Sequence, residues 1–498
     1  MIRSIKILLT IVTLAILGGC EVVVTPMGDV DLPEQVICSH NATQKVVNYT
    51  LHATNGKAEA VRVSAHAHDS WITEIEASEP GTLRLTLEPN HGEKRTTTVE
   101  VTAPGYRKAS FSVVQLDVPK SMARHTLMYL FLGTSLGNYF KTNIADAGIA
   151  IEQGILGSSN RVIYFRQRST TEAYIAEVLL DTDSGKHVEV VLHDNIIIEG
   201  PQLTPEQLGN FISMMANTAP AERYGIIMAG HGHGWIPREV LEGGGATEFY
   251  IGSQVYNPWI PALGAEVTRA YGERNVMVNP SEIAIAVEHS QVELDYILFD
   301  ACFMSNIETI YTLRNCANYI IASPCEIMGK GFPYHRTLPH LFANEGKDTE
   351  YVAAAESYYL FYRDEYTYNS RCGSIALYDC SEVEALAEAT RQALQGMNME
   401  YDRTKLQTYE GQHEHFFYDF GEWVNCVATD AAALEAFNRQ LDKAVVAKFT
   451  LPSFYSAYGS VGTYPINTDV YSGVTTSAPS TAYREAWSAT EWYKATMQ

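Results

Sequence analysis

The pattern of apolar and polar positions along the chain predicts an all-β region first. Between about residues 35 and 117, apolar and polar residues alternate, as in AVRVSAHAH and GTLRLTLEPN. Turn segments such as TNGK and PNHGEK separate the alternating runs. Alternation with a period of two in short runs is typical of half-buried strands. We therefore predict a small β-sandwich over residues 35–117.

After a linker at about residues 116–124, the pattern changes to continuous apolar runs separated by helical segments. TLMYLFLG, YGIIMAG, DYILFDA and YIIASP are typical of buried strands, and PSEIAIAVEHS is typical of a helix. This alternation predicts an α/β fold with a mostly parallel sheet covered by helices. We place this domain at 125–340 and a mixed, helix-rich extension of it at 341–498. Helices within the extension are predicted at 350–363, 381–397 and 431–448.

The first twenty residues, MIRSIKILLTIVTLAILGGC, are typical of a bacterial export signal. Arg3 and Lys6 precede an apolar run that is too short for a typical membrane span. The ending LGGC resembles a lipobox, which implies removal of residues 1–19 and lipid on Cys20. We expect an exported lipoprotein at the outer membrane or cell surface, with 20–34 as a tether. The alternative is an ordinary signal whose cysteine is accidental.

Charge and cysteine content narrow the class of protein. The net charge is −23 and the chain contains no basic run, which argues against a nucleic-acid partner. Of the eight cysteines, Cys20 is assigned to lipid, so an odd number remains and at least one is unpaired within the chain. Their spacing is not that of a zinc site. An unpaired thiol in an exported protein raises the question of its reactivity.

Two predicted strands end in reactive side chains. YGIIM leads into AGHGHGW, which holds His231, and YILF leads into DACFMS, which holds Cys302. Functional groups gather at the carboxyl ends of parallel strands, so both tips are expected side by side. A thiol needs a base or a lowered pKa to react, and a neighbouring histidine can act as that base. A helix predicted to begin just after Cys302 would further favour the thiolate.

Four motifs in this order resemble the clostripain family of cysteine peptidases, which are caspase-like in fold. They are TLMYLFLGTSLGNYF, HGHGW, DACFMSNIE and YIIASPCEIMGKGFPY, and they lie within residues 125–340. The resemblance implies that Cys302 is the nucleophile and His231 the base. It further implies that the backbone N–H groups of Gly232 and Cys302 bind the oxyanion. Asp300 then corresponds to the acidic residue at the base of a pocket for Arg or Lys on the substrate.

The all-β region carries a resemblance of its own. Trp71, GTLRLTLEPN, Arg95 and FSVVQ follow one another as in the BACON domain of Bacteroidetes surface proteins. That family is often described as carbohydrate-binding, so glycan is a possible partner. The sequence contains no evident aromatic platform, and a single Trp71 is expected in the core. A spacer that holds the peptidase away from the membrane is the simpler interpretation.

Several residues near the motifs keep alternative roles. His233 stands where the family usually has glycine, and two histidines at i and i+2 could chelate one metal ion. No third ligand follows closely, so we expect no metal and interpret His233 as a polar group of the cleft. Trp235 is expected to cover the histidine turn. Cys325 is expected to be a packing residue near the cleft, and Glu308 a structural partner on its helix.

The family resemblance alone raises two further expectations, self-cleavage of the chain and dependence on calcium. Some members cut themselves after the histidine motif, and here the segment 236–280 offers Arg238, Arg269 and Arg274. Members often depend on calcium, but no 12-residue calcium loop is visible, so a structural or activating calcium has no assignable site. The chemistry itself is expected to need no cofactor.

The prediction that results is a lipid-anchored, exported cysteine endopeptidase. It would cleave protein or peptide substrates after Arg or Lys through a Cys302–His231 dyad. The main alternative is a non-catalytic surface protein that binds glycan or protein and carries a degenerate peptidase domain. A second alternative is a metal-dependent hydrolase, which a chelator should inactivate and a thiol alkylator should not.

Overall fold

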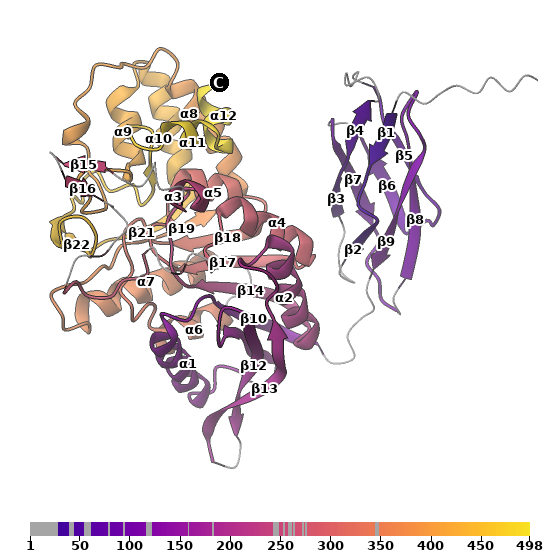
Figure 1. The fold of residues 1–498 in the computed structure, drawn as a ribbon, viewed down its shortest axis with the longest axis horizontal. Helices are drawn as coiled ribbons and strands as arrows, with labels where there is room; N and C mark the ends of the chain where they lie inside the picture. Colours follow the sequence, from indigo (N-terminus) through magenta and orange to yellow (C-terminus); the bar gives the residue numbers. More distant parts are fainter. Residues whose placement is uncertain are drawn as a thin grey trace, which may run out of the picture. The chain divides into compact units, whose positions relative to one another are not determined.

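The chain divides into two compact units, residues 1–118 and 119–498, in a computed structural model (Figure 1). Each unit is described by itself. The proposed signal peptide, Cys20 and Arg274 lie outside the described residues. The structure describes residues 28–38, 44–53, 61–77, 80–92, 95–115, 122–157, 159–181, 184–242, 249–251, 254–256, 261, 264–270, 273, 276–343 and 348–498.

The N-terminal unit is all-β, as predicted from its alternating pattern. Apolar positions of its strands point into one core, which includes Leu85 and Val101. Trp71 belongs to this core, and the guanidinium of Arg95 lies 4.6 Å from its ring centroid. The sheets are β2 (Gln35–Cys38), β9 (Ala109–Gln115), β8 (Arg95–Thr102) and β5 (Ser64–Ala67); β3 (Gln44–Asn48), β7 (Thr82–Leu87) and β6 (Ile72–Glu76); and β1 (Gly28–Asp31) with β4 (Thr50–Ala53).

A nine-stranded sheet organises the second unit, in the order β13-β12-β11-β10-β14-β17-β18-β19-β21. Its five central strands, β11 to β18 in this order, are parallel, and the two strands at each edge are antiparallel. The predicted mostly parallel sheet is therefore confirmed. The strands are β10 (Ala123–Phe131), β11 (Asn160–Gln167), β12 (Glu172–Asp181), β13 (Lys186–Ile197), β14 (Ala221–Ala229), β17 (Leu294–Asp300), β18 (Ala317–Ala322), β19 (Ile375–Asp379) and β21 (Val445–Phe449).

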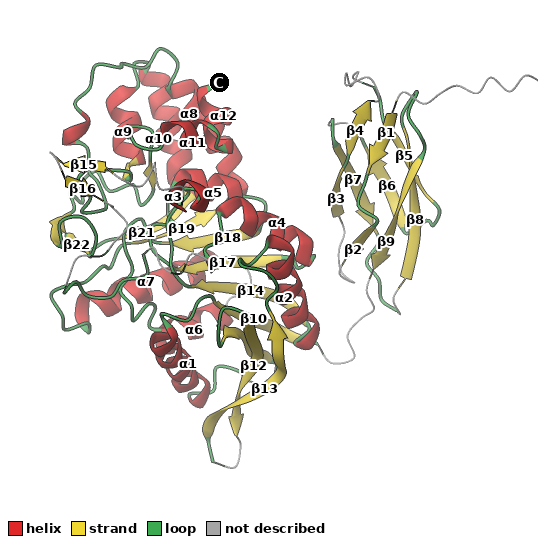
Figure 2. Ribbon diagram, in the orientation of Figure 1, coloured by secondary structure: helices red, strands yellow, loops and turns green. Residues whose placement is uncertain are grey.

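Helices cover both faces of this sheet, as Figure 2 shows. Alternate residues of the central strand β10 point to opposite faces, so Leu127 and Tyr129 join one core while Met128 and Leu130 join the other. A strand buried on both faces explains the continuous apolar run. The first core takes side chains from α1 (Gly137–Glu152), α6 (Tyr334–Ala343) and α7 (Asp348–Asp364), and the second from α2 (Pro205–Thr218), α4 (Pro280–Ser290), α5 (Ile307–Leu313) and α8 (Val383–Ala393).

Residues 341–498 contribute strands β19 and β21 to the same sheet. The helix predicted at 431–448 is too long, because α10 ends at Ala444 and the β-branched pair Val445–Val446 begins β21. The helix predicted at 381–397 is shorter as well, since α8 covers Val383–Ala393. The remaining helices of this region are α9 (Phe420–Val427), α11 (Arg484–Ser488) and α12 (Glu491–Met497).

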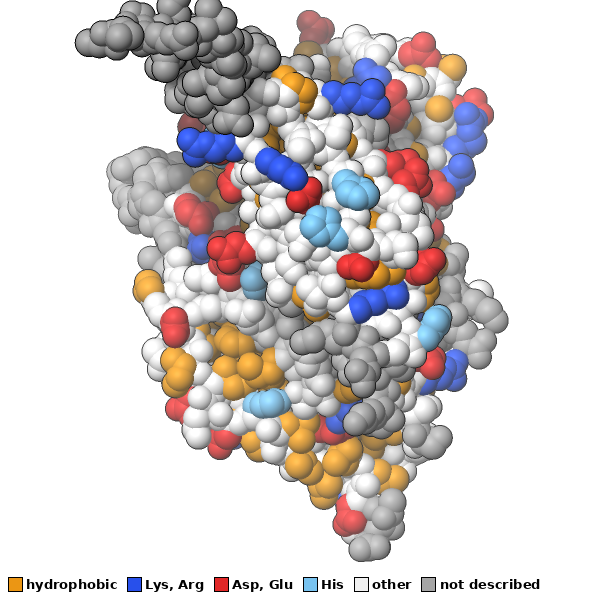
Figure 3. All heavy atoms as spheres, turned by 90° about the vertical axis from the view of Figure 1, so that its right-hand side faces the viewer, with side chains coloured by type: hydrophobic (Ala, Val, Ile, Leu, Met, Phe, Trp, Pro, Cys, Tyr) orange, Lys and Arg blue, Asp and Glu red, His pale blue; other side chains and the backbone are white. Residues whose placement is uncertain are grey.

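Two surface properties bear on possible partners. No helix among the described residues is long and apolar enough to cross a membrane. On the face drawn in Figure 3, acidic and basic side chains are interspersed, and the described residues form no continuous basic area there.

A buried histidine makes stability depend on pH. His125 of β10 is 1% exposed and lies against Tyr296 and Phe342. Burial, with help from the positive charges of Arg223 and Arg124, lowers the pKa of His125 to about 3. Below pH 6.5 the unfolded chain takes up a proton that the folded chain excludes. The free energy of unfolding should therefore fall by up to about 1.4 kcal/mol per pH unit as the pH decreases from 6.5 to 4.

Denaturant unfolding of wild type and His125→Gln at pH 7, 6 and 5 measures this contribution. Other groups titrate in both proteins, so the difference between them isolates His125. The wild type should lose more stability than His125→Gln between pH 7 and 5. Parallel pH profiles for the two proteins would contradict the assignment.

Candidate active site

The two reactive strand tips lie side by side. β14 and β17 are parallel neighbours, and Ala229 stands opposite Asp300 in their register. The chain then continues into the histidine turn and into Cys302. A Cβ atom at Gly232 would lie 2.1 Å from the carbonyl oxygen of Cys302, so only glycine allows this approach. The structure thus brings together the two motifs that the sequence separates by some seventy residues.

Cys302 is fully buried, and its thiol contacts the backbone of Ile327. The Ile327 N–H donates to Sγ at 2.9 Å, and Sγ lies 3.5 Å from the Ile327 carbonyl oxygen. Burial raises the pKa of the Cys302 thiol well above its ordinary value. The expectation that a helix begins just after Cys302 and lowers this pKa is wrong. That helix, α5, begins at Ile307, because Asn306 caps it by accepting from the Thr309 N–H.

His231 is held by one partner on each ring nitrogen. Nδ1 lies 2.8 Å from the Ala270 carbonyl oxygen, which can only accept, so Nδ1 carries the proton. Nε2 then accepts from the hydroxyl of Ser135 at 2.9 Å. Burial lowers the pKa of His231 to about 4, which keeps the ring neutral near pH 7. Such a ring can take up a proton during a reaction.

Ser135 belongs to the loop after β10, and the sequence analysis did not single it out. The carboxylate of Glu273 fixes this loop. It accepts from the Thr134 N–H at 2.5 Å, from the Thr134 hydroxyl at 2.6 Å and from the Ser135 N–H. The signal that could have identified Ser135 is its position at the carboxyl end of a third central strand.

Asp300 forms a buried ion pair with Arg269. Both side chains are 0% exposed, and Arg269 Nη1 lies 2.9 Å from Asp300 Oδ2. The same oxygen accepts from the Tyr334 hydroxyl at 2.5 Å. Burial raises the pKa of Asp300, and the guanidinium of Arg269 and the Tyr334 hydroxyl act in the opposite direction. A carboxylate with partners of this kind is suited to bind a cationic side chain.

The pocket around the Arg269 guanidinium supplies more acceptors than Asp300 alone. Nη2 donates to the Asn143 side-chain oxygen at 2.7 Å and to the Gly329 carbonyl at 3.0 Å. Nη1 lies 3.2 Å from the backbone carbonyl of Asp300. The guanidinium is therefore bound along its edges by acceptors from three segments, a geometry that suits arginine.

The backbone of Arg269 occupies the predicted oxyanion position. Its carbonyl oxygen accepts from the Gly232 N–H at 2.8 Å and from the Cys302 N–H at 3.2 Å. These are the two donors that the family resemblance implies. Arg269 therefore has its side chain on Asp300 and its carbonyl between both donors. The segment that contains Arg269 thus lies between Asp300 and these two N–H groups.

The other residues singled out from the sequence lie around this site. His233 is 3% exposed, its Nδ1 lies 2.8 Å from the Ile236 carbonyl oxygen, and burial lowers its pKa to about 4. Trp235, expected to cover the turn, is 5% exposed and donates to Ser477 at 2.7 Å. Cys325 is fully buried and its carbonyl accepts from Phe303. Glu308 accepts from Thr476, Ser477 and Trp487 of the C-terminal region.

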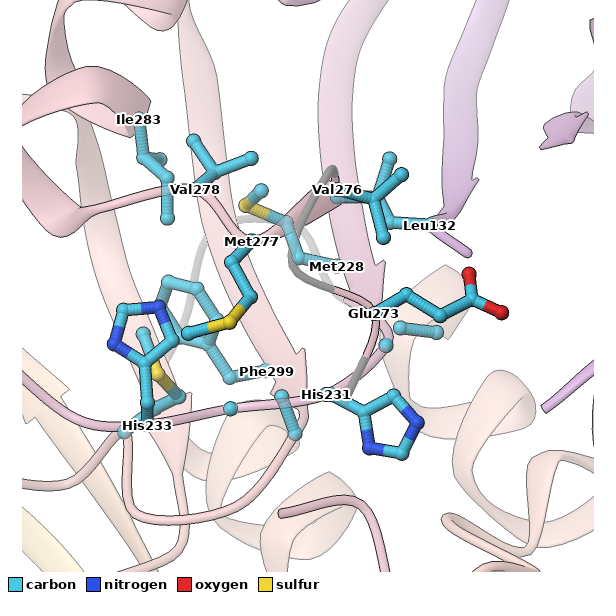
Figure 4. A pocket seen from close by; sticks show the side chains of 15 residues that line it. Leu132, Met228, His231, His233, Glu273, Val276, Met277, Val278, Ile283 and Phe299 are labelled. Carbon is cyan, nitrogen blue, oxygen red and sulfur yellow. The ribbon is translucent and has the colours of Figure 1, made fainter. Parts of the chain in front are cut away.

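A mostly apolar pocket lies behind the histidine turn. In Figure 4, His231 and His233 project to different sides, and Glu273 lies near His231. The two rings thus do not converge on one point. Within the described parts of the chain, no group of three or more His, Cys, Asp or Glu side chains is arranged to hold a metal ion. The pocket is lined by Leu132, Met228, Ala229, Gly230, His231, Gly232, His233, Glu273, Val276, Met277, Val278, Ile283, Phe299, Ala301 and Met304.

Comparison with known proteins places the chain among cysteine peptidases. The sequence model of the clostripain family matches residues 267–471. A secreted C11 cysteine protease from Bacteroides thetaiotaomicron, "iotapain", is 28% identical, with a TM-score of 0.64 over 76% of this chain and 99% of that chain. An inactive zymogen C11 protease from Parabacteroides distasonis is 26% identical, with a TM-score of 0.60 over 76% of this chain and all of that chain, 100%. Comparison with curated proteins finds no match.

The burial of Cys302 makes its reactivity testable. In the intact chain, iodoacetamide at pH 7.5 should modify Cys302 at least about tenfold more slowly than the exposed Cys426, because only the thiolate reacts and burial disfavours it. Peptide mapping by mass spectrometry over time measures both rates in the same sample. Faster modification of Cys302 than of Cys426 would show that the site is open and the thiol activated.

Proposed function

The chain belongs to the clostripain family of cysteine peptidases, and from this premise we propose that it is an endopeptidase that cleaves after Arg or Lys. Cys302 is the nucleophile, His231 transfers protons and Asp300 selects the basic side chain. One observation carries the proposal: Arg269 has its guanidinium on Asp300 and its carbonyl oxygen on the Gly232 and Cys302 N–H groups. A substrate that places an arginine in this way has its carbonyl oxygen on the backbone N–H of the residue that carries the thiol.

The proposed reaction follows from these contacts. His231 takes the proton of the Cys302 thiol, and Sγ attacks the carbonyl carbon of the basic residue. The N–H groups of Gly232 and Cys302 stabilise the negative charge that develops on the carbonyl oxygen. His231 then gives its proton to the nitrogen of the following residue, and the C–N bond breaks. Water hydrolyses the thioester with His231 as the base, which regenerates the thiol.

Arginine fits the pocket better than lysine on geometric grounds. The Arg269 guanidinium donates from Nη2 to Asn143 and Gly329 and from Nη1 to Asp300. A lysine ammonium is a compact charge with a different donor geometry and cannot reproduce this planar set of contacts. We therefore propose that Arg is preferred and Lys accepted.

Among the three candidate arginines, Arg269 is the one we propose as the self-processing site. Arg238 is buried against α4, where it pairs with Glu282 and the Met277 carbonyl. Arg269 already lies in the site, and its following residue Ala270 contacts His231. Hydrolysis of the bond between Arg269 and Ala270 would separate the histidine and cysteine motifs into two chains.

Localisation and the N-terminal unit complete the proposal. We propose that the protein is exported and anchored through lipid on Cys20, on the evidence of the signal sequence; a similar protease is described as secreted. The N-terminal all-β unit, BACON-like in sequence, then acts as a spacer, with glycan as a further possible partner. The steps above use only groups of this chain. A structural or activating calcium rests on the family resemblance alone and has no assigned site.

Self-processing of the purified full-length chain tests the nucleophile. Incubation should yield a fragment that begins at Ala270, because the Arg269 carbonyl oxygen lies on the N–H groups of Gly232 and Cys302. In Cys302→Ala the chain should stay intact, a loss of at least about 1000-fold in rate, since the covalent step is removed. Gel electrophoresis and N-terminal sequencing measure the products.

Cys426→Ala is the matched control, because Cys426 is an exposed cysteine, and it should process like wild type. Equal processing of Cys302→Ala and wild type would assign the cleavage to another nucleophile. An intact wild-type chain that also cleaves no peptide would favour the non-catalytic binding protein.

Peptide substrates test the pocket. Processed wild type should cleave internally quenched peptides with Arg before the scissile bond about tenfold better in kcat/KM than the matched Lys peptides. Peptides with Leu or Asp at this position should not be cleaved measurably, because they leave Asp300 without a cationic partner. Cleavage after Leu or Asp would support the proposed peptidase activity but would contradict the proposal that Asp300 selects the basic side chain.

A further inference from the structure

The segment before Arg269 lies extended along the loop that follows β18. The Arg269 N–H donates to the Ile327 carbonyl at 2.8 Å, and the Gly329 N–H donates to the Val267 carbonyl at 2.7 Å. Between these two bonds, Thr268 and Met328 form an antiparallel bridge. A peptide substrate that adds to this loop in the same way would follow the path of residues 267–269.

Successive side chains of this segment meet different surroundings. The side chain of Val267 is largely open to solvent, with the residue 47% exposed, whereas Thr268 is 4% exposed. The low exposure of Thr268 shows that the residue just before the basic one is directed into the protein. The site that receives Thr268 is therefore enclosed, and it can discriminate between side chains.

The Thr268 hydroxyl donates to the carboxylate of Glu326 at 2.7 Å. Glu326 is 0% exposed and lies in the loop after β18, one residue after Cys325. Its other oxygen accepts from the Ser456 hydroxyl at 2.5 Å and from the Ala457 N–H at 3.1 Å. The proposed reaction uses neither Glu326 nor its partners, although Glu326 is buried next to the path of the segment.

Among the described residues, the hydrogen bonds to the Glu326 carboxyl group come from neutral donors, namely two hydroxyl groups and one backbone N–H. Ala457 N–H also lies 3.2 Å from Oε2, the oxygen that faces Thr268. The Thr268 hydroxyl is therefore the close donor to Oε2, and the segment itself supplies it. A peptide with an isosteric valine would leave this oxygen with one longer hydrogen bond in a dry site, which is unfavourable. Burial raises the pKa of Glu326 to about 7, and a second carboxyl group there would place two acidic groups together in a dry site.

We propose that Glu326 is a specificity-determining residue that selects serine or threonine immediately before the basic residue of the substrate. This inference rests on the proposed function, because it takes the docked segment as a guide to substrate binding. The preferred substrate class is then a peptide with a small hydroxyl side chain followed by Arg. Selection at this position works by loss of a hydrogen bond to a buried acceptor, which rejects the apolar isostere more strongly than a difference in size would.

The chain's own segment provides the first test. Processing between Arg269 and Ala270 should slow about 30-fold in Thr268→Val and stay within about threefold of wild type in Thr268→Ser. Val267→Ala is the matched control, because Val267 is exposed, and it should process at the wild-type rate. Equal rates for Thr268→Val and Thr268→Ser would overturn the inference.

A peptide panel provides the second test, with Arg fixed before the scissile bond and the preceding residue varied among Thr, Val, Asn and Asp. These side chains are similar in volume, so hydrogen bonding and charge decide the order. Processed wild type should cleave the Thr peptide about 30-fold better in kcat/KM than the Val peptide and should reject Asp most strongly.

Glu326→Gln should reduce the Thr-to-Val ratio to about fivefold or less and raise the relative cleavage of the Asp peptide. An amide that keeps its oxygen toward Ala457 turns its N–H₂ group toward the substrate. Ratios within one enzyme preparation do not depend on how much of it is active, so partial misfolding of the variant does not affect the result. An unchanged Thr-to-Val ratio in Glu326→Gln would remove Glu326 as the cause.

The outcomes separate the inference from the function on which it rests. Cleavage of Arg peptides with Thr and Val equally accepted in wild type overturns only the role of Glu326. Failure to cleave any Arg peptide, together with an intact Arg269–Ala270 bond in wild type, overturns the proposed function itself.

Discussion

The buried ion pair between Asp300 and Arg269 is the interaction on which the arrangement of the site depends. Two charges at 0% exposure are unfavourable unless they are paired and hydrogen-bonded, and here both conditions hold. The Tyr334 hydroxyl supports the carboxylate, and Asn143 and Gly329 support the guanidinium. Because Asp300 is fixed at the end of β17, the pair also fixes the position of the Arg269 backbone. From that backbone the contacts of the Arg269 carbonyl with the N–H groups of Gly232 and Cys302 follow.

The sheet supplies the rigid reference for these contacts. β14 and β17 are central strands buried on both faces, so the turns that follow them start from well-defined positions. Gly232 then passes against Cys302 at a distance that excludes any side chain. The loop after β10 adds Ser135, which holds the second nitrogen of His231. The neighbouring strands β10, β14 and β17 are thus followed by Ser135, His231 and Cys302, respectively, at the same edge of the sheet.

Sequence reasoning predicted what depends on local pattern. The alternation in residues 35–117 predicted the all-β unit, and the apolar runs before His231 and Cys302 predicted two strands of a mostly parallel sheet. The helix α5 begins at Ile307, later than the predicted start just after Cys302, and the preceding Ser305 binds another segment. Its hydroxyl donates to Gly473, far along the chain, and Asn306 caps the helix instead.

Contacts between segments that are distant in the chain produce no local pattern of apolar and polar residues, so the sequence did not predict them. Ser135 meets His231 across 96 positions, and Thr134 meets Glu273 across 139. Glu326 is one acidic residue among many in a chain of charge −23, and only the fold reveals that it faces Thr268. Arg269 was one of three candidate arginines, and its pairing with Asp300 depends on a loop that sequence alone cannot place.

The docking of Arg269 has a consequence for the step after its peptide bond is cut. Hydrolysis would leave Arg269 as a new carboxyl terminus whose guanidinium still lies on Asp300, so the cut protein would be an enzyme–product complex with itself. Its new amino terminus, Ala270, would still be held through its carbonyl by the Tyr458 hydroxyl and His231. Scission and activity are then separate events. The lag between them would then be set by the rate at which the bound Arg269 leaves Asp300. A high concentration of a good substrate cannot make this lag shorter than that departure allows.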